Sequence, residues 1–445
     1  MAPSSRRMLA IVVALATMVA ALAGAGGGVA ASAPPVEAVR AAVTYTPATV
    51  RVPAATVKKQ LLKVSDDGAT YTFKKRAGVL TKLKPGKVML LERHSVRTVT
   101  SAKVVKKRWV VQTTPAALTD VVEDGTLSWS SGVDWAKSFA VSGAGVPGTR
   151  TAARKNGAVT LSGKVQGYGY SATYTPSKTG IAVKISITRA TPVDLEVTIT
   201  GTLTNLKTAG SITLNRGQLT DAQWLANNIA GKFELAYTAK PVSALGLGQA
   251  GGIKVTLPAE VAVPFMVGPL PFYVGIKVAF VASAGFSNFD QKLAGSYTLD
   301  YDGHGGFSVN GAGTTTAQGA IDGLGKILLD AGTAVATGPL SFTLGAQLPQ
   351  LELGLGTKGL NVAGNVTLGG QTGIATYGAG CDTRKYQVIG TTGASAAFFG
   401  LSASLFSKTL FDKSYYASYP NGCGVFPGRD QSRSNSLAAT GLTPR

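Results

Sequence analysis

The feature that most constrains the fold is a nearly uncharged stretch, residues 261–289, in which Lys277 is the only charged side chain. Within it, apolar residues occupy every second position, at Leu270, Phe272, Val274, Ile276, Val278 and Phe280. A period of two is typical of a β-strand with one buried face. We therefore expect a strand here, packed against a substantial core.

A transmembrane helix is the alternative for this stretch, because it is longer than the roughly 20 residues that a helical span needs. Three prolines interrupt it, Pro264, Pro269 and Pro271, and Lys277 would lie inside the bilayer. Proline disrupts a helix interior, and a charge within a membrane is costly. These residues favour the strand.

Composition extends the strand prediction to most of the chain. The 445 residues include 56 glycines, and valine and threonine fill the alternating runs, as in β-sheets. We predict an all-β fold with a small basic β domain. A large antiparallel β-sandwich or barrel-like sheet with one or two short helices follows it.

Five segments follow from the changes in composition. Arg6 and Arg7 precede an apolar run and small residues, the pattern of an export signal. The expected segments are a signal peptide at 1–31, a basic mostly-β domain at 41–135, a Gly/Ser-rich linker at 136–158, a large charge-poor antiparallel β domain at 159–426 and a disordered tail at 427–445.

Local signals predict individual elements. Alternation over 181–187 and again over 193–203 predicts a hairpin. Asp67-Gly68 and Pro85-Gly86 are typical of tight turns. Thr114 as N-cap before Pro115 predicts a short helix that ends at Asp124-Gly125, and Thr220 with Gln223 predicts a second one that ends at Gly231.

The positive charge is concentrated in the small domain. Residues 51–108 carry 16 Lys/Arg and three acidic residues, a local charge of +13 out of a total of +21. Such a field attracts polyanions. For an exported protein we expect anionic cell-wall polymers or lipid headgroups as partners and no nucleic acid; the composition leaves the oligomeric state undetermined. The expected binding residues are Lys74, Lys75, Arg76, Lys106, Lys107 and Arg108.

The two cysteines, Cys381 and Cys423, are expected to form a disulfide, because export would place them in an oxidising compartment.

Residues that could carry chemistry are scarce. The sequence has two histidines and no G-x-S-x-G motif, and we expect no catalytic residue and no cofactor. Asp300, Asp302 and His304 would share a face of a continuous strand and are weak candidates for metal ligands. A hairpin turn at the neighbouring glycines is the alternative that we favour.

One part of the chain resembles a known group of proteins. Leu83-x-x-Gly86-x-Val88 and Thr113-x-Pro115-Ala-x-Leu118-Thr-Asp120 lie within residues 79–128, which resemble a module of uncharacterised exported β-rich bacterial surface proteins. The resemblance implies a structural module and assigns no catalytic residue.

Three functions remain open. The first is an exported, extracellular or cell-surface, non-catalytic envelope protein, structural or binding, that attaches electrostatically to anionic cell-envelope polymers. The second is a lipid-binding or membrane-inserting β protein, which the charge-poor region 241–380 favours. The third is a carboxylate-dependent glycan hydrolase, whose paired acids would meet only after folding.

Overall fold

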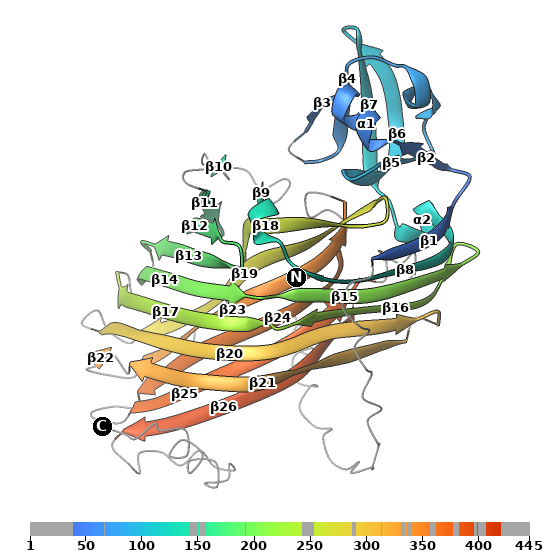
Figure 1. The fold of residues 1–445 in the computed structure, drawn as a ribbon. Coiled ribbons are helices and arrows are strands. Elements are labelled where there is room, and N and C mark those ends of the chain that lie inside the picture. The colour runs from blue at the N-terminus through green and yellow to red at the C-terminus, as the bar shows by residue number, and fades with distance from the viewer. Residues whose placement is uncertain are drawn as a thin grey trace, which may run out of the picture. The chain divides into compact units, whose positions relative to one another are not determined.

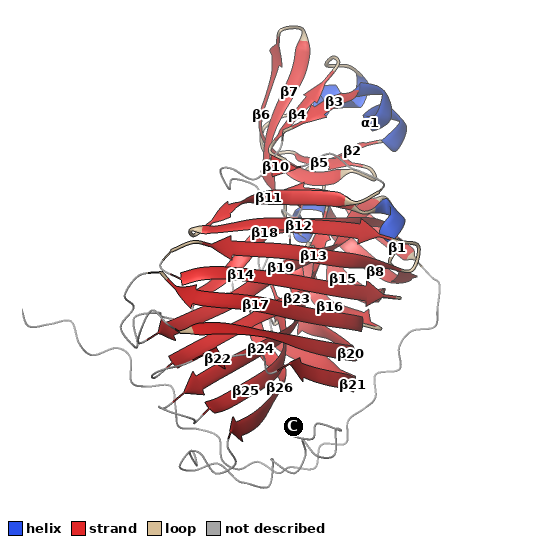
Figure 2. Ribbon diagram, turned by 90° about the vertical axis from the view of Figure 1, so that its left-hand side faces the viewer, coloured by secondary structure: helices blue, strands red, loops and turns tan. Residues whose placement is uncertain are grey.

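Strands dominate the computed structural model, which describes residues 39–65, 67–142, 150–151, 157–191, 193–242, 253–286, 291–312, 314–330, 334–335, 340–356, 362–376, 382–395, 398 and 406–419. Within these ranges the strands form three sheets, of 13, seven and six strands (Figures 1 and 2). The all-β prediction is confirmed.

The six-stranded sheet and its loops contain the basic segment at residues 51–108. Its order is β2-β5-β6-β7-β4-β3, and β2 and β5 are parallel. The strands are β2 (Thr49–Val52), β3 (Leu61–Val64), β4 (Thr70–Phe73), β5 (Val88–Leu91), β6 (Ser95–Val105) and β7 (Arg108–Pro115). Helix α1 (Ala54–Gln60) and the 3-10 helix η1 (Gly78–Lys82) pack against its core, which includes Phe73, Leu80 and Trp109. The expected turns at Asp67-Gly68 and Pro85-Gly86 are present.

The helix expected at 114–125 is much shorter than predicted. Helix α2 is the single turn Leu118–Val121, and the Asp120 carboxylate accepts a hydrogen bond from the Ala117 N–H, 2.8 Å away. The acid three residues into the helix therefore caps it, and Thr114 remains in β7. Gly125 lies inside β8 (Val122–Gly132), where a Cβ would lie 2.0 Å from the Ala42 carbonyl of β1 (Arg40–Tyr45).

The 13-stranded sheet has the order β1-β8-β15-β16-β20-β17-β14-β13-β12-β11-β10, with β21 and β22 also paired to β20. Its further strands are β10 (Arg150–Thr151), β11 (Val159–Val165), β12 (Tyr168–Pro176), β13 (Gly180–Arg189), β14 (Val193–Thr204), β15 (Lys207–Asn215), β16 (Gln218–Asn227), β17 (Ala230–Pro241), β20 (Lys292–Asn310), β21 (Thr315–Asp330) and β22 (Ala334–Val335). The hairpin expected from the alternation at 181–203 is β13–β14.

The seven-stranded sheet has the order β26-β25-β24-β23-β19-β18-β9. Its strands are β9 (Phe139–Ser142), β18 (Ile253–Val267), β19 (Leu270–Phe286), β23 (Leu340–Leu355), β24 (Val362–Thr376), β25 (Asp382–Ala394) and β26 (Phe406–Tyr419). The 3-10 helix η2 (Trp135–Lys137) precedes β9.

The two larger sheets pack face to face through aromatic side chains. Ring centroids lie 5.4 Å apart for Trp129 and Phe272, 5.0 Å for Tyr168 and Phe280, and 5.3 Å for Tyr237 and Phe342. In each pair the first residue belongs to the 13-stranded sheet and the second to the seven-stranded sheet. The buried core therefore lies between these sheets, as the sandwich prediction requires.

The nearly uncharged stretch forms part of this core as a hairpin. β18 and β19 are joined by the turn Gly268-Pro269, which Pro271 follows closely, whereas Pro264 is accommodated inside β18 opposite Tyr273. The alternating apolar residues of β19 face the core as expected. The opposite face is also buried, including Tyr273 at 0% exposure.

The strand pairing of the 13-stranded sheet is interrupted at residues 205–206 and 228–229, and we call this interruption the crease. β14 and β15 are nearly continuous and pair with β17 and β16, which are also nearly continuous, so that together they form one long hairpin (Figure 1). Both arms are interrupted at the same level, where Asn205 and Asn228 have positive φ angles of 53° and 55°. β20 pairs with β17 before this level and with β16 beyond it.

Two predictions about this region were wrong. The residues expected to form a helix at 220–231 lie in β16 and β17, because β16 is paired on both sides and buries Trp224. The glycines near His304 do not make a hairpin turn, because β20 continues through them and accommodates two bulges in its pairing with β21.

Several predicted features lie outside the described residues. These are the signal peptide, both cysteines of the expected disulfide and the tail at 427–445. Of the expected linker at 136–158, the described parts include β9 and β10. None of the helices in the described ranges has the length and apolar character needed to cross a membrane.

Candidate functional site

Two basic triplets meet at one end of the small sheet. The first triplet, Lys74, Lys75 and Arg76, follows β4. In the second triplet, Lys106 and Lys107 form the turn between β6 and β7, and Arg108 is the first residue of β7. β4 and β7 are antiparallel, and Phe73 pairs with Trp109. The loop after β4 therefore lies beside the hairpin turn, and we call these six residues the basic tip. The hairpin forms one end of the small sheet in Figure 2.

Contacts within the basic tip hold the loop against the hairpin. The guanidinium carbon of Arg76 lies 5.1 Å from the centre of the Trp109 ring, and Arg76 Nη2 donates to the Thr81 carbonyl at 3.5 Å. Trp109 is buried under this cation. Arg76 thus has a packing role as well as a charge.

The cations of the basic tip are available to an external anion. All six side chains are exposed. No ion pair within the described ranges includes any of the six, and the ion pair found in the small sheet joins Arg51 to Glu92 at 2.7 Å. The like charges of an exposed cluster repel one another, and a bound polyanion reduces this repulsion.

The hairpin turn carries backbone strain at its lysines. Lys106 and Lys107 have φ angles of 48° and 64°, so both occupy the left-handed region. In the described parts of the chain, the other two-residue turns with two positive φ angles, Gln166-Gly167 and Arg216-Gly217, have glycine at the second position. Only glycine adopts this conformation without steric cost. The basic tip therefore retains a lysine where glycine would be more stable.

Two further lysines adjoin the basic tip and were not included in the prediction. Lys58 and Lys59 are exposed in the last turn of α1, and the Gln60 carbonyl that follows them accepts a hydrogen bond from the Lys74 N–H at 2.8 Å. Both lysines lie within the basic residues 51–108, and this position in the sequence could have indicated that they belong with the basic tip.

A second charged cluster is buried in the seven-stranded sheet. Lys277 Nζ lies 2.6 Å from Glu352 Oε2 and 3.6 Å from Glu260 Oε2. Glu260 and Glu352 are both 4% exposed. The three side chains come from the adjacent strands β18, β19 and β23, and we call them the buried triad.

The electrostatics of the buried triad follow from burial and from the pairing of one cation with two carboxyl groups. Burial raises the pKa of Glu260 to about 7, an effect that Lys277 opposes and Glu352 reinforces. Burial lowers the pKa of Lys277, but the two carboxylates outweigh it and leave that pKa raised. Lys277 therefore stays protonated, and Glu260 is the member that titrates near neutral pH.

Tyr273 lies next to the triad on the same face of the sheet. Its ring lies over Gly354, where an added Cβ would be 2.3 Å from the ring. Burial, with the nearby carboxylates, raises the pKa of Tyr273 well above its usual value, so its hydroxyl remains neutral. The ring helps to exclude water from the carboxylates.

In the buried triad, the two carboxylates are paired with a cation and are not presented to a substrate. Two nearby carboxylates could in principle act as acid and base on a glycan. Here the Lys277 ammonium donates a hydrogen bond to Glu352 and forms an ion pair with Glu260, and all three groups are largely shielded from solvent. Sequence reasoning singled out Lys277 but missed its partners. The signal was that a lone charge in a buried strand needs counter-charges.

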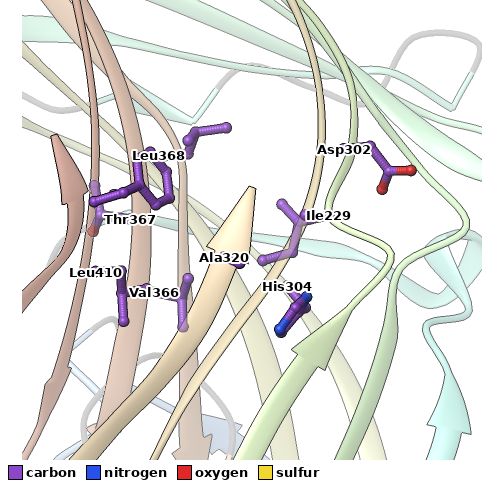
Figure 3. A pocket seen from close by; sticks show the side chains of 11 residues that line it. Ile229, Asp302, His304, Ala320, Val366, Thr367, Leu368 and Leu410 are labelled. Atoms are coloured by element: carbon purple, nitrogen blue, oxygen red, sulfur yellow. The ribbon is translucent and has the colours of Figure 1, made fainter. Parts of the chain in front are cut away.

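The weak metal candidates occupy one strand without forming a ligand set. Asp300, Asp302 and His304 all lie in β20. Among the residues that can be described, no three His, Cys, Asp or Glu side chains are grouped closely enough to hold a metal ion. Figure 3 shows the Asp302 carboxylate pointing away from the His304 ring.

His304 instead borders a small, mostly apolar cavity between β20–β21 and β24–β26 (Figure 3). The apolar lining comes from Ile229, Ala320, Val366, Leu368, Leu410 and Phe411. Its free volume of about 20 Å³ is room for about one water molecule, so we assign no ligand to it.

The comparisons with known proteins concern the N-terminal part of the chain. Residues 32–124 match a family described as a domain of unknown function, DUF8403. These residues include the whole basic tip, and the match supports the expectation of an N-terminal module from an uncharacterised family. The searches of the curated proteins and of the solved structures found no match.

Proposed function

We propose that the protein is an exported, non-catalytic envelope protein that binds anionic components of the cell envelope through the basic tip. The observation that carries this proposal is the convergence of two basic triplets, distant in sequence, at one exposed end of the small sheet. The N-terminal sequence pattern supports export.

The mechanism is Coulomb attraction and release of counterions. Each lysine or arginine near an anionic surface contributes about 1 kcal/mol, and the interaction falls off within a Debye length of about 8 Å at physiological ionic strength. Six exposed cations on two adjoining loops can therefore contact several phosphates or carboxylates together. The rigid sheet below them holds the cluster in place.

The test compares two variants that each lose three positive charges. The first is Lys74→Gln, Lys106→Gln and Lys107→Gln, which leaves Arg76 on Trp109. The matched control is Lys178→Gln, Lys184→Gln and Lys207→Gln, three exposed lysines in the part of the chain that follows the basic domain. Binding to purified cell wall and to anionic vesicles is measured across a salt series.

We expect the basic-tip variant to bind roughly 100-fold more weakly at low salt, from about 1 kcal/mol per lysine, and the control to bind nearly as the unaltered protein does. Added salt should weaken binding of the unaltered protein to both surfaces. Equal losses in the two variants would assign binding to net charge alone and would refute a localised site. Turnover of a wall glycan would contradict the non-catalytic proposal.

A further inference from the structure

The β6–β7 hairpin carries exposed apolar side chains next to its cations. Five large apolar side chains are markedly exposed in the described ranges, and two of them are consecutive in this hairpin. Val104 is 62% and Val105 39% exposed. They precede Lys106 directly, so the apolar and the cationic side chains occupy the same end of the hairpin.

The pairing of β6 explains this exposure. β5 pairs with β6 only from Ser95 to Thr98, and β7 pairs with the rest of β6 on its other side. Beyond Thr98, the edge of β6 that β5 leaves has no partner strand within the described ranges. The two valines thus lie on a free edge of the sheet, which continues on the other side of β6 through β7 to β4 at Phe73, and both are exposed at this edge.

We propose that the partner of this hairpin is an anionic lipid bilayer, with Val104 and Val105 entering the boundary between headgroups and acyl chains. This inference rests on the proposed function, because the same basic tip supplies the electrostatic attraction. A soluble polyanion offers phosphates or carboxylates alone. A bilayer surface also offers an apolar layer just below them, and the edge of β6 presents valines directly beside lysines, so a hairpin that lies along the surface can contact both layers.

The lysines suit this geometry. Each ammonium group ends a flexible apolar stem, so the stems of Lys103, Lys106 and Lys107 can lie beside the inserted valines while their charges remain among the lipid phosphates. Binding then has two parts: an electrostatic one that salt weakens and an apolar one that salt leaves in place.

The experiment separates these parts with the variant Val104→Thr plus Val105→Thr. Threonine keeps the β-branched shape at both exposed positions, and the midpoint of urea unfolding verifies that the fold is retained. Val242→Thr is the control, because Val242 is 44% exposed and lies outside the hairpin. Binding is measured to vesicles of phosphatidylglycerol and phosphatidylcholine in equal parts, and to polyphosphate on beads.

We expect the double variant to bind the vesicles roughly tenfold more weakly, to bind the polyphosphate beads unchanged, and the control to match the unaltered protein on both. Unchanged vesicle binding alongside intact bead binding would overturn the bilayer inference and leave the proposed function standing. An equal loss on beads and vesicles would also overturn the inference, because the beads have no acyl layer. Failure of the unaltered protein to bind either surface would overturn the proposed function itself.

Discussion

Glu260 links the stability of the seven-stranded sheet to pH. Its carboxyl is almost fully buried, and burial raises its pKa to about 7 from an ordinary value of 4.5. Between these two values the folded chain holds a proton that the unfolded chain has released. Since the folded state binds more protons in this range, the free energy of unfolding should fall as pH rises from about 4.5 to 7.

Replacing Glu260 by Gln should remove this pH dependence, since the amide cannot ionise. Urea unfolding of the two proteins at several pH values measures the difference: the stability of the variant relative to the unaltered protein should increase with pH across the window. Asp194→Asn is the control, because Asp194 forms an exposed pair with Lys240 at 3.1 Å and such pairs contribute little. The same pH slope in both Glu260 forms would mean that the carboxyl is not protonated in the folded state.

The buried triad also shows how far single-residue reasoning can reach. The sequence indicates that Lys277 is an isolated charge in a buried strand, and hence that counter-charges are required. It does not identify them, because Glu352 is brought beside Lys277 only when β23 pairs with β19. Which acids pair with a buried cation depends on strand order, and that is a property of the whole sheet.

At the scale of the element, the strained turn of the β6–β7 hairpin separates stability from binding. Lys107→Gly should stabilise the protein by about 0.5–1 kcal/mol, because the left-handed conformation costs glycine little while the unfolded chain gains flexibility that partly offsets the benefit. The same change should weaken binding to anionic surfaces, because one cation is lost. Urea unfolding and vesicle binding, measured on one preparation, check both effects.

Lys107→Gln is the matched variant for this turn, since it removes the charge and keeps the strained backbone. It should weaken binding to the same extent without gaining stability. A Lys107→Gly protein that is less stable than the unaltered one would show that the Lys107 side chain makes stabilising contacts.

Strands with long, regular alternation and two short turns were predictable from the sequence, and the helices predicted from capping signals were not. β13 and β14 alternate over many residues, and that pattern requires one buried face whichever strands lie beside them. The capping signal at Thr220 and Gln223 was overridden, because pairing on both sides of β16 satisfies its backbone and buries Trp224. The six residues of the basic tip were predicted as one binding set, but the strand register that brings their two loops together was not predicted.

At the scale of the whole molecule, the crease depends on residues that tolerate positive φ angles. Asn228 has a φ of 55°, and the next residue, Ile229, donates its N–H to the Gly303 carbonyl of β20 at 2.8 Å. Asn228→Val should destabilise the protein by about 1–2 kcal/mol, because a β-branched residue is strained in this region. Asn228→Gly should change stability by less than about 0.5 kcal/mol.

Asn227→Val is the neighbouring control, because Asn227 is a regular strand residue paired with Lys207, and valine favours strands. The measurement is again urea unfolding. Equal destabilisation by valine at both positions would show that the loss comes from the asparagine side chains and not from the backbone at the crease.

The crease also bears on how the long hairpin finds its correct alignment. Its two arms span Val193–Asn215 and Gln218–Pro241, and alternating strands of this length could pair two residues out of step and still bury the same faces. Such a slip would carry the break at Asn228 away from the break at Asn205, leaving each left-handed residue opposite a regular strand. The two breaks at one level therefore make a misaligned hairpin less stable than the correctly aligned one, which favours the correct register as the chain folds.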